Sequence, residues 1–156
     1  MAWKDDICYA AMYIGLPVPS NGKKSDSFRI MTKASLKILL VDDSKIMRRM
    51  ISSLLGKMGY AEVLEAANAF MALKILDSEK IDFVISDFSM PGLSGLELLK
   101  TMRRDPLKRD IPFVMVTAEA QLSQIIAAFT AGAQQYVTKP FTLKYLEYII
   151  DKIVRA

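Results

Sequence analysis

From Leu36 onward, short apolar runs alternate with longer stretches in which apolar residues recur every three or four positions. The short runs are typical of strands buried on both faces, and the periodic stretches are typical of amphipathic helices. The expected strands are 36–41, 62–66, 81–86, 112–117 and 135–139. The expected helices begin at Ser44 and near Asn68, and span 96–103, 122–131 and 143–154. This alternation predicts an α/β fold, a doubly wound five-stranded parallel sheet with helices on both faces.

The first and last helices each predict a buried face. Ser44 is a suitable N-cap for the first helix, and Gly59 should end it. Its apolar face is expected to contain Ile46, Met50, Ile51, Leu54, Leu55 and Met58. In the last helix the expected inward stripe is Leu146, Ile150 and Ile153, with Tyr148 outward and Tyr145 and Ile149 at the margins.

The first part of the chain lacks this periodicity. We expect residues 1–34 to form an N-terminal extension, with a short helix at 4–14 and a turn-rich linker at 17–34, and residues 35–156 to form the folded domain. An extension from an upstream start codon, with Met31 as the ordinary start, and an unstructured tail are alternatives. The apolar run 7–16 is too short to span a bilayer, and Asp5 and Asp6 argue against a signal peptide.

Composition removes several classes of function. The 156 residues include no histidine, which excludes Ser-His-Asp catalysis, histidine metal sites and a phosphohistidine donor. Cys8 is the only cysteine, so neither an internal disulfide nor a cysteine zinc cluster can form. The net charge of +4 is too small to indicate nucleic-acid binding by itself. We expect neither a nucleic acid nor a membrane as partner.

Polar residues follow four of the expected strands. Asp42 and Asp43 follow the first, Asp87 the third and Thr117 the fourth, and Lys139 ends the fifth. In a doubly wound sheet the carboxyl ends of the strands form the ligand site. Three carboxylates at one edge favour a bound Mg²⁺, and a carboxylate beside that ion can act as a nucleophile towards phosphorus. Lys139 and Thr117 can then bind the phosphoryl oxygens.

Simpler interpretations exist for some of these residues. An Asp-Asp pair after a strand is also typical of a helix N-terminus, where the helix dipole favours acids. Thr117 could be an ordinary hydroxyl in a turn at the end of a strand.

Five stretches of the sequence resemble response-regulator receiver domains, in particular the single-domain chemotaxis members of that family. They are LLVDDSKIMRR (39–49), VISDFSMPGLSGLELLKTMRRD (84–105), VMVTAEA (114–120), IIAA (125–128) and YVTKPFT (136–142). The resemblance covers about 120 residues. It implies the strand order 2-1-3-4-5.

The resemblance also implies roles for the acids. Asp87 corresponds to the aspartate that accepts a phosphoryl group. Asp42 and Asp43 correspond to the acid pair that holds Mg²⁺ together with Asp87, and the backbone carbonyl of Ser89 corresponds to a further ligand. Mg²⁺ is therefore the expected cofactor.

The remaining implied roles concern conformational switching. Thr117 corresponds to the hydroxyl that moves towards the phosphoryl group, and Tyr136 to the aromatic side chain that turns inward behind it, although Tyr136 could also be plain packing. Lys139 corresponds to the lysine that pairs with the acyl phosphate, and the Lys139–Pro140 peptide bond is expected to be cis.

The resemblance implies a stand-alone response regulator of a two-component, chemotaxis-type system in the cytoplasm, acting as a monomer or a phosphorylation-dependent dimer. We therefore expect no enzymatic activity beyond its own phosphorylation and dephosphorylation. A histidine kinase would donate the phosphoryl group, and a flagellar motor switch protein and a phosphatase are further partners. The expected partner face is Tyr136, Tyr145, Tyr148 and Ile149. The alternative is a phosphorelay intermediate or phosphate sink in another pathway.

Some positions depart from the chemotaxis relatives. Phe88 and Ser89 stand where tryptophan and asparagine are common, and Gln121 and Leu122 stand where lysines are common, so the lifetime of the acyl phosphate and the target are open.

Three other classes of protein fit the sequence less well. A dehalogenase-type hydrolase needs Asp-x-Asp and a cap, a flavodoxin-like binder needs phosphate-binding donors after the first strand, and a DNA-binding regulator needs a second domain.

Overall fold

We describe residues 32–155 of a computed structural model of the chain. The expected helix at 4–14 and most of the expected linker lie outside the described residues. Lys33 and Ala34, at the end of the expected linker, instead lie in the 3-10 helix η1 (Lys33–Ser35). Lys33 forms ion pairs with Glu147 at 3.3 Å and with Asp151 at 3.6 Å, so this short helix contacts the last helix of the domain.

Within the described residues, five parallel strands form one sheet in the order β2-β1-β3-β4-β5, which is the order that the family resemblance implies. The strands are β1 (Lys37–Val41), β2 (Glu62–Ala66), β3 (Phe83–Asp87), β4 (Phe113–Thr117) and β5 (Gln135–Thr138). Every residue of β3 and β4 is buried, which explains why each strand is apolar up to the polar residues at its carboxyl end.

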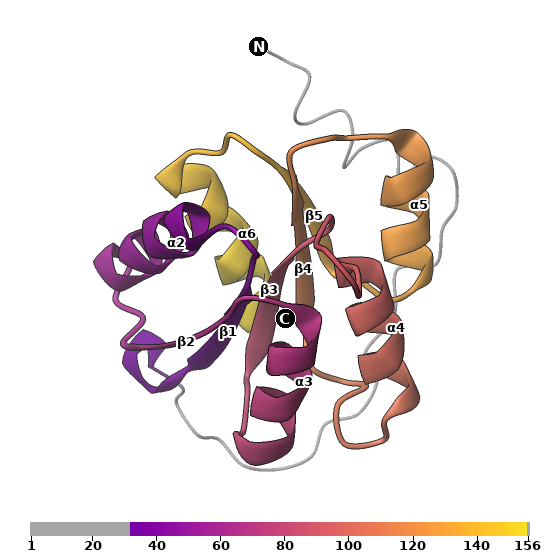
Figure 1. The fold of residues 1–156 in the computed structure, drawn as a ribbon. Coiled ribbons are helices and arrows are strands. Elements are labelled where there is room, and N and C mark those ends of the chain that lie inside the picture. Colours follow the sequence, from indigo (N-terminus) through magenta and orange to yellow (C-terminus); the bar gives the residue numbers. More distant parts are fainter. Residues whose placement is uncertain (1–31, 156) are drawn as a thin grey trace. The chain divides into compact units, whose positions relative to one another are not determined.

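In the part of the chain that the structure describes, five α-helices cover the two faces of the sheet (Figure 1). They are α2 (Lys45–Lys57), α3 (Ala69–Ser78), α4 (Gly95–Arg104), α5 (Leu122–Thr130) and α6 (Leu143–Arg155). Helices α2 and α6 cover one face, and α3, α4 and α5 cover the other. Among residues 32–155, no helix combines the length and the apolar character needed to cross a membrane.

Capping residues set the starts of three helices. The Ser44 side chain accepts a hydrogen bond from the Met47 N–H at 3.3 Å, and Asn68 accepts one from Met71 at 2.9 Å. At the start of α4, Ser94 forms a reciprocal capping box with Glu97. These caps fix where each helix begins relative to the strand before it.

Two predicted helix faces are partly wrong. Ile46 is 79% exposed and Met50 is 44% exposed, because the buried stripe of α2 is centred on Ile51 and Leu55. Residues one position before a stripe point about 100° away from it. Ile149 is only 1% exposed and belongs to the core, because it lies three residues after the buried Leu146 on the same helix face.

Candidate functional site

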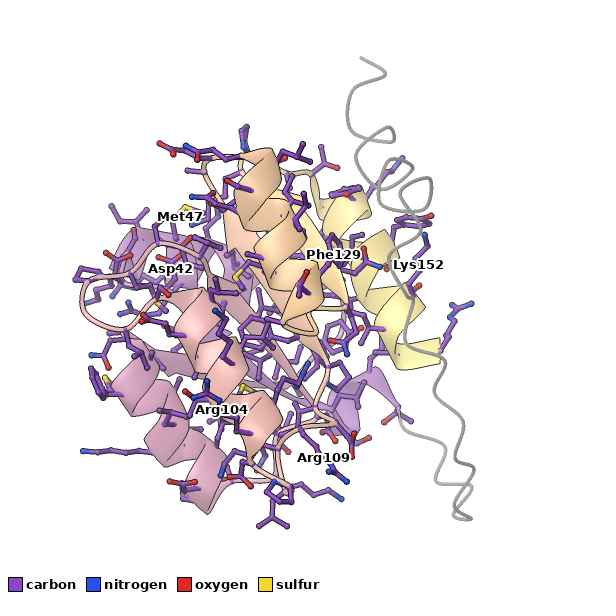
Figure 2. The ribbon with its side chains drawn as sticks, turned by 90° about the vertical axis from the view of Figure 1, so that its right-hand side faces the viewer. Asp42, Met47, Arg104, Arg109, Phe129 and Lys152 are labelled. Carbon is purple, nitrogen blue, oxygen red and sulfur yellow. The ribbon has the colours of Figure 1, made fainter. Side chains whose placement is uncertain are left out.

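The polar residues expected at the sheet edge do come together. Asp42 follows β1, Asp87 ends β3 and Thr117 ends β4, and all three are buried. Lys139 follows β5 and reaches the same place with its side chain. Figure 2 shows Asp42 at the opposite end of the domain from Arg109, whose loop precedes β4. The site therefore lies at the carboxyl edge of the sheet.

Lys139 bridges two buried carboxylates. Its Nζ donates to Asp42 Oδ2 at 2.8 Å and lies 3.4 Å from Asp87 Oδ1. Its backbone N–H donates to the Thr117 carbonyl at 2.7 Å, and the Lys139–Pro140 peptide bond is cis, as expected. The ammonium therefore lies closer to Asp42 than to Asp87, the predicted phosphoryl acceptor.

Asp42 is fixed on both sides of its carboxylate. While Oδ2 accepts from Lys139, Oδ1 accepts from the Ser44 N–H at 2.8 Å. The backbone N–H of Asp42 donates to the Ala66 carbonyl on the neighbouring strand at 3.2 Å. Its carboxylate therefore has little freedom to move away from the site.

Asp42, Asp43 and Asp87 can place one carboxylate oxygen each within 4.8 Å of one another. The Asp43 side chain is exposed, whereas the other two are buried. Oxygen ligands on a partly open edge suit Mg²⁺, which keeps several of its waters. Ser89, the expected backbone ligand, is an exposed residue of the loop that follows β3, and its role stays a prediction.

Asp87 is an electrostatically unfavourable carboxylate. Burial raises its pKa above the ordinary value, Asp42 and Asp43 raise it further, and Lys139 opposes the shift. The ionised form is therefore stabilised less than it would be in water. A bound cation would relieve this repulsion, so the charges of the site fit Mg²⁺.

We expect Asp87→Asn to raise the free energy of unfolding at pH 7 without Mg²⁺ by on the order of 1 kcal/mol. A raised folded-state pKa means that the stability contributed by Asp87 is complete below the ordinary aspartate pKa and is lost as pH rises through the folded value. The advantage of the variant should thus disappear below about pH 4. Urea unfolding at both pH values measures it, with the exposed Asp110→Asn as control. An equal difference at both pH values would contradict the electrostatic explanation.

Gly95 is a residue of the site that the sequence did not indicate. It lies next to the backbone of Asp87, the predicted phosphoryl acceptor, and a Cβ at this position would lie 2.0 Å from the Asp87 carbonyl oxygen. The Gly95 N–H donates to the Phe88 carbonyl at 3.0 Å, and the Phe88 N–H donates to Val116 at 2.9 Å. The start of α4 is therefore in direct contact with the segment that carries Asp87.

Thr117 and Tyr136 meet at Glu119. The Thr117 hydroxyl accepts a hydrogen bond from the Glu119 N–H at 3.3 Å, and the Tyr136 hydroxyl donates to the Glu119 carbonyl at 3.2 Å. Tyr136 is only 6% exposed, and burial raises its pKa. It lies inward in this structure, and its place in the partner face stays a prediction.

The other members of the expected partner face differ in exposure. Tyr148 is 53% exposed, and Tyr145 is half-buried against the core. Ile149 is buried and cannot contact a partner in this conformation. On the neighbouring helix α5, Leu122 is 64% exposed and Ile126 is 38% exposed.

This arrangement of a doubly wound sheet with three aspartates, a threonine and a lysine at its carboxyl edge defines a signalling receiver domain. Residues 38–151 match the family model described as the response regulator receiver domain, and the chain belongs to that family. Such domains act in signalling rather than as metabolic catalysts.

The similar proteins include chemotaxis regulators. The chain is 45% identical over 118 residues to the chemotaxis protein CheY of Pseudomonas aeruginosa, which covers 76% of this chain and 95% of that protein. It is 43% identical over 119 residues to the chemotaxis protein CheY-3 of Vibrio cholerae, which covers 76% of this chain and 92% of that protein.

Solved structures of similar fold agree with this assignment. The Vibrio cholerae chemotaxis protein CheY4 has a TM-score of 0.71 and 32% identity, covering 76% of this chain and 98% of that chain. A response regulator from Chloroflexus aurantiacus, described as putative, has a TM-score of 0.74 and 36% identity, covering 78% and 98%.

Proposed function

We propose that the chain is a stand-alone response regulator of a two-component chemotaxis system, phosphorylated on Asp87 by a histidine kinase. The observation that supports this most is the position of Lys139, which lies between the buried carboxylates of Asp42 and Asp87. The CheY relatives, whose lengths this chain spans almost completely, support the chemotaxis assignment.

The proposed reaction is transfer of a phosphoryl group from a phosphohistidine to Asp87. A carboxylate oxygen of Asp87 forms a bond to phosphorus as the phosphorus–nitrogen bond breaks, and the departing imidazole takes up a proton. Asp42, Asp43, Asp87 and the Ser89 carbonyl would hold Mg²⁺, which when bound would supply positive charge that offsets the charge of the phosphoryl oxygens. Lys139, with its Nζ 3.4 Å from Asp87 Oδ1, is placed to donate to one of those oxygens.

The proposed switch uses Thr117 and Tyr136. A phosphoryl group on Asp87 provides an acceptor for the Thr117 hydroxyl, which in this structure accepts from Glu119. Movement of Thr117 would change the space next to Tyr136, which donates to the same residue. Phosphorylation would then favour the conformer that interacts better with the phosphoryl group.

The proposed output is protein binding by the α5–β5–α6 face. This face presents the exposed apolar side chains Leu122, Ile126 and Tyr148. A flagellar motor switch protein is the proposed target, and a phosphatase that ends the signal is a further partner. These partners and a cytoplasmic kinase place the protein in the cytoplasm in this proposal, as a monomer or as a dimer formed on phosphorylation.

Transfer from a radiolabelled, autophosphorylated chemotaxis histidine kinase tests this proposal. We expect the label to leave the kinase and appear on this chain, but not on Asp87→Asn, and then to be released as inorganic phosphate. Onward transfer to a second histidine-containing domain would favour the alternative of a phosphorelay intermediate. Absence of transfer from any kinase of the same cell would contradict the proposal.

A further inference from the structure

Arg48 makes contacts that neither the fold nor the proposed chemistry has used. It is the fourth residue of α2, and its side chain is only 13% exposed. Nη1 donates to the Asp42 carbonyl at 2.7 Å and to the Asp43 carbonyl at 3.3 Å. Nε donates to Glu65 Oε2 on β2 at 3.2 Å. One guanidinium therefore joins the loop between β1 and α2 to the neighbouring edge strand.

Asp43 depends on this contact more than Asp42 does. The Asp42 carboxylate accepts hydrogen bonds from Ser44 and Lys139. Within residues 32–155, the structure shows no hydrogen bond to the Asp43 carboxylate, which is exposed. Because its side chain is not held, the direction of this carboxylate is set by its backbone, and Arg48 binds that backbone at the carbonyl.

We propose that Arg48 is a positioning residue that orients the Asp42–Asp43 backbone for Mg²⁺ binding. This inference rests on the proposed function, since it concerns the same acid site. The planar guanidinium suits the role because its fork can donate in two directions at once, here to the loop carbonyls and to Glu65. Groups that orient metal ligands typically change metal affinity by 10-fold to 100-fold when they are removed.

The direction in which Mg²⁺ affinity changes when Arg48 is replaced distinguishes a positioning role from a purely electrostatic one. Arg48 is a cation close to an acid cluster, so loss of its charge alone would strengthen Mg²⁺ binding. Loss of positioning would weaken it. We expect Arg48→Ala to bind Mg²⁺ about tenfold more weakly than the native chain. Arg49→Ala is the matched control, because it removes the same charge from the next residue, which is exposed and outside these contacts.

A titration of the full chain with MgCl₂, monitored through the amide NMR chemical shifts, measures both the Mg²⁺ affinity and whether the chain is folded. Weaker binding by Arg48→Ala, with Arg49→Ala within about twofold of the native chain, would support the proposal. Equal or tighter binding by a folded Arg48→Ala would overturn it. If Arg48→Ala does not fold, Arg48→Lys decides, since it keeps the charge without the fork: weaker binding supports the proposal, and native affinity overturns it. Absence of binding by the native chain would instead contradict the proposed Mg²⁺ site.

Discussion

Gly95→Ala should destabilise the domain by about 3 kcal/mol and slow phosphorylation of Asp87 by about 100-fold. The added Cβ would lie 2.0 Å from the Asp87 carbonyl oxygen and 3.0 Å from its carbonyl carbon. Backbone atoms cannot rotate away as a flexible side chain can, so either α4 or the Asp87 segment must move. Urea unfolding measures the first effect, and the rate of phosphorylation by acetyl phosphate measures the second.

Gly56→Ala is the matched control for this variant. Gly56 lies near the end of α2, and a Cβ there has no atom within 4 Å. Alanine is the better helix former by up to about 1 kcal/mol, so this variant should be as stable as the native chain or more so. Native stability of Gly95→Ala would contradict the close approach of α4 to Asp87.

Lys139→Ala should lower the free energy of unfolding by about 3 kcal/mol in the absence of Mg²⁺. The substitution removes the cation that pairs with Asp42 at 2.8 Å and with Asp87 at 3.4 Å, and both carboxylates stay buried. Saturating Mg²⁺ should restore much of the loss, because a ligand that binds only the folded chain stabilises it and here replaces the missing positive charge.

Thermal unfolding with and without Mg²⁺ measures this difference. Lys144→Ala, an exposed lysine on α6, is the control and should change stability by less than about 0.5 kcal/mol under both conditions. If Lys139→Ala is as stable as the control without Mg²⁺, the ammonium is not what balances the two buried carboxylates.

The fold was predictable because local signals agree with one another. Strands such as β3 begin with a run of apolar residues that are buried, and Ser44 and Asn68 cap the helices where the sequence suggests. The helix faces were less predictable. Ile46 and Ile149 are equally apolar, yet one is exposed and the other buried, because the sheet covers a limited sector of each helix.

The acid site was predictable for a topological reason. The carboxyl ends of parallel strands meet at one edge, so Asp42, Asp87 and Thr117 had to approach each other once the strands were identified. Arg48 and Gly95 were missed because their roles depend on contacts through space. Arg48 binds carbonyls five and six residues earlier in the chain, and Gly95 approaches the backbone of a neighbouring segment.

The central claim is that Asp87 accepts a phosphoryl group when Mg²⁺ is present. Intact mass after incubation with acetyl phosphate and Mg²⁺ tests it most directly. The proposal predicts the addition of one phosphoryl group to the native chain, and none to Asp87→Asn or to a sample with the metal chelated. No addition to a native chain that is folded, or the same addition to Asp87→Asn, would contradict the claim.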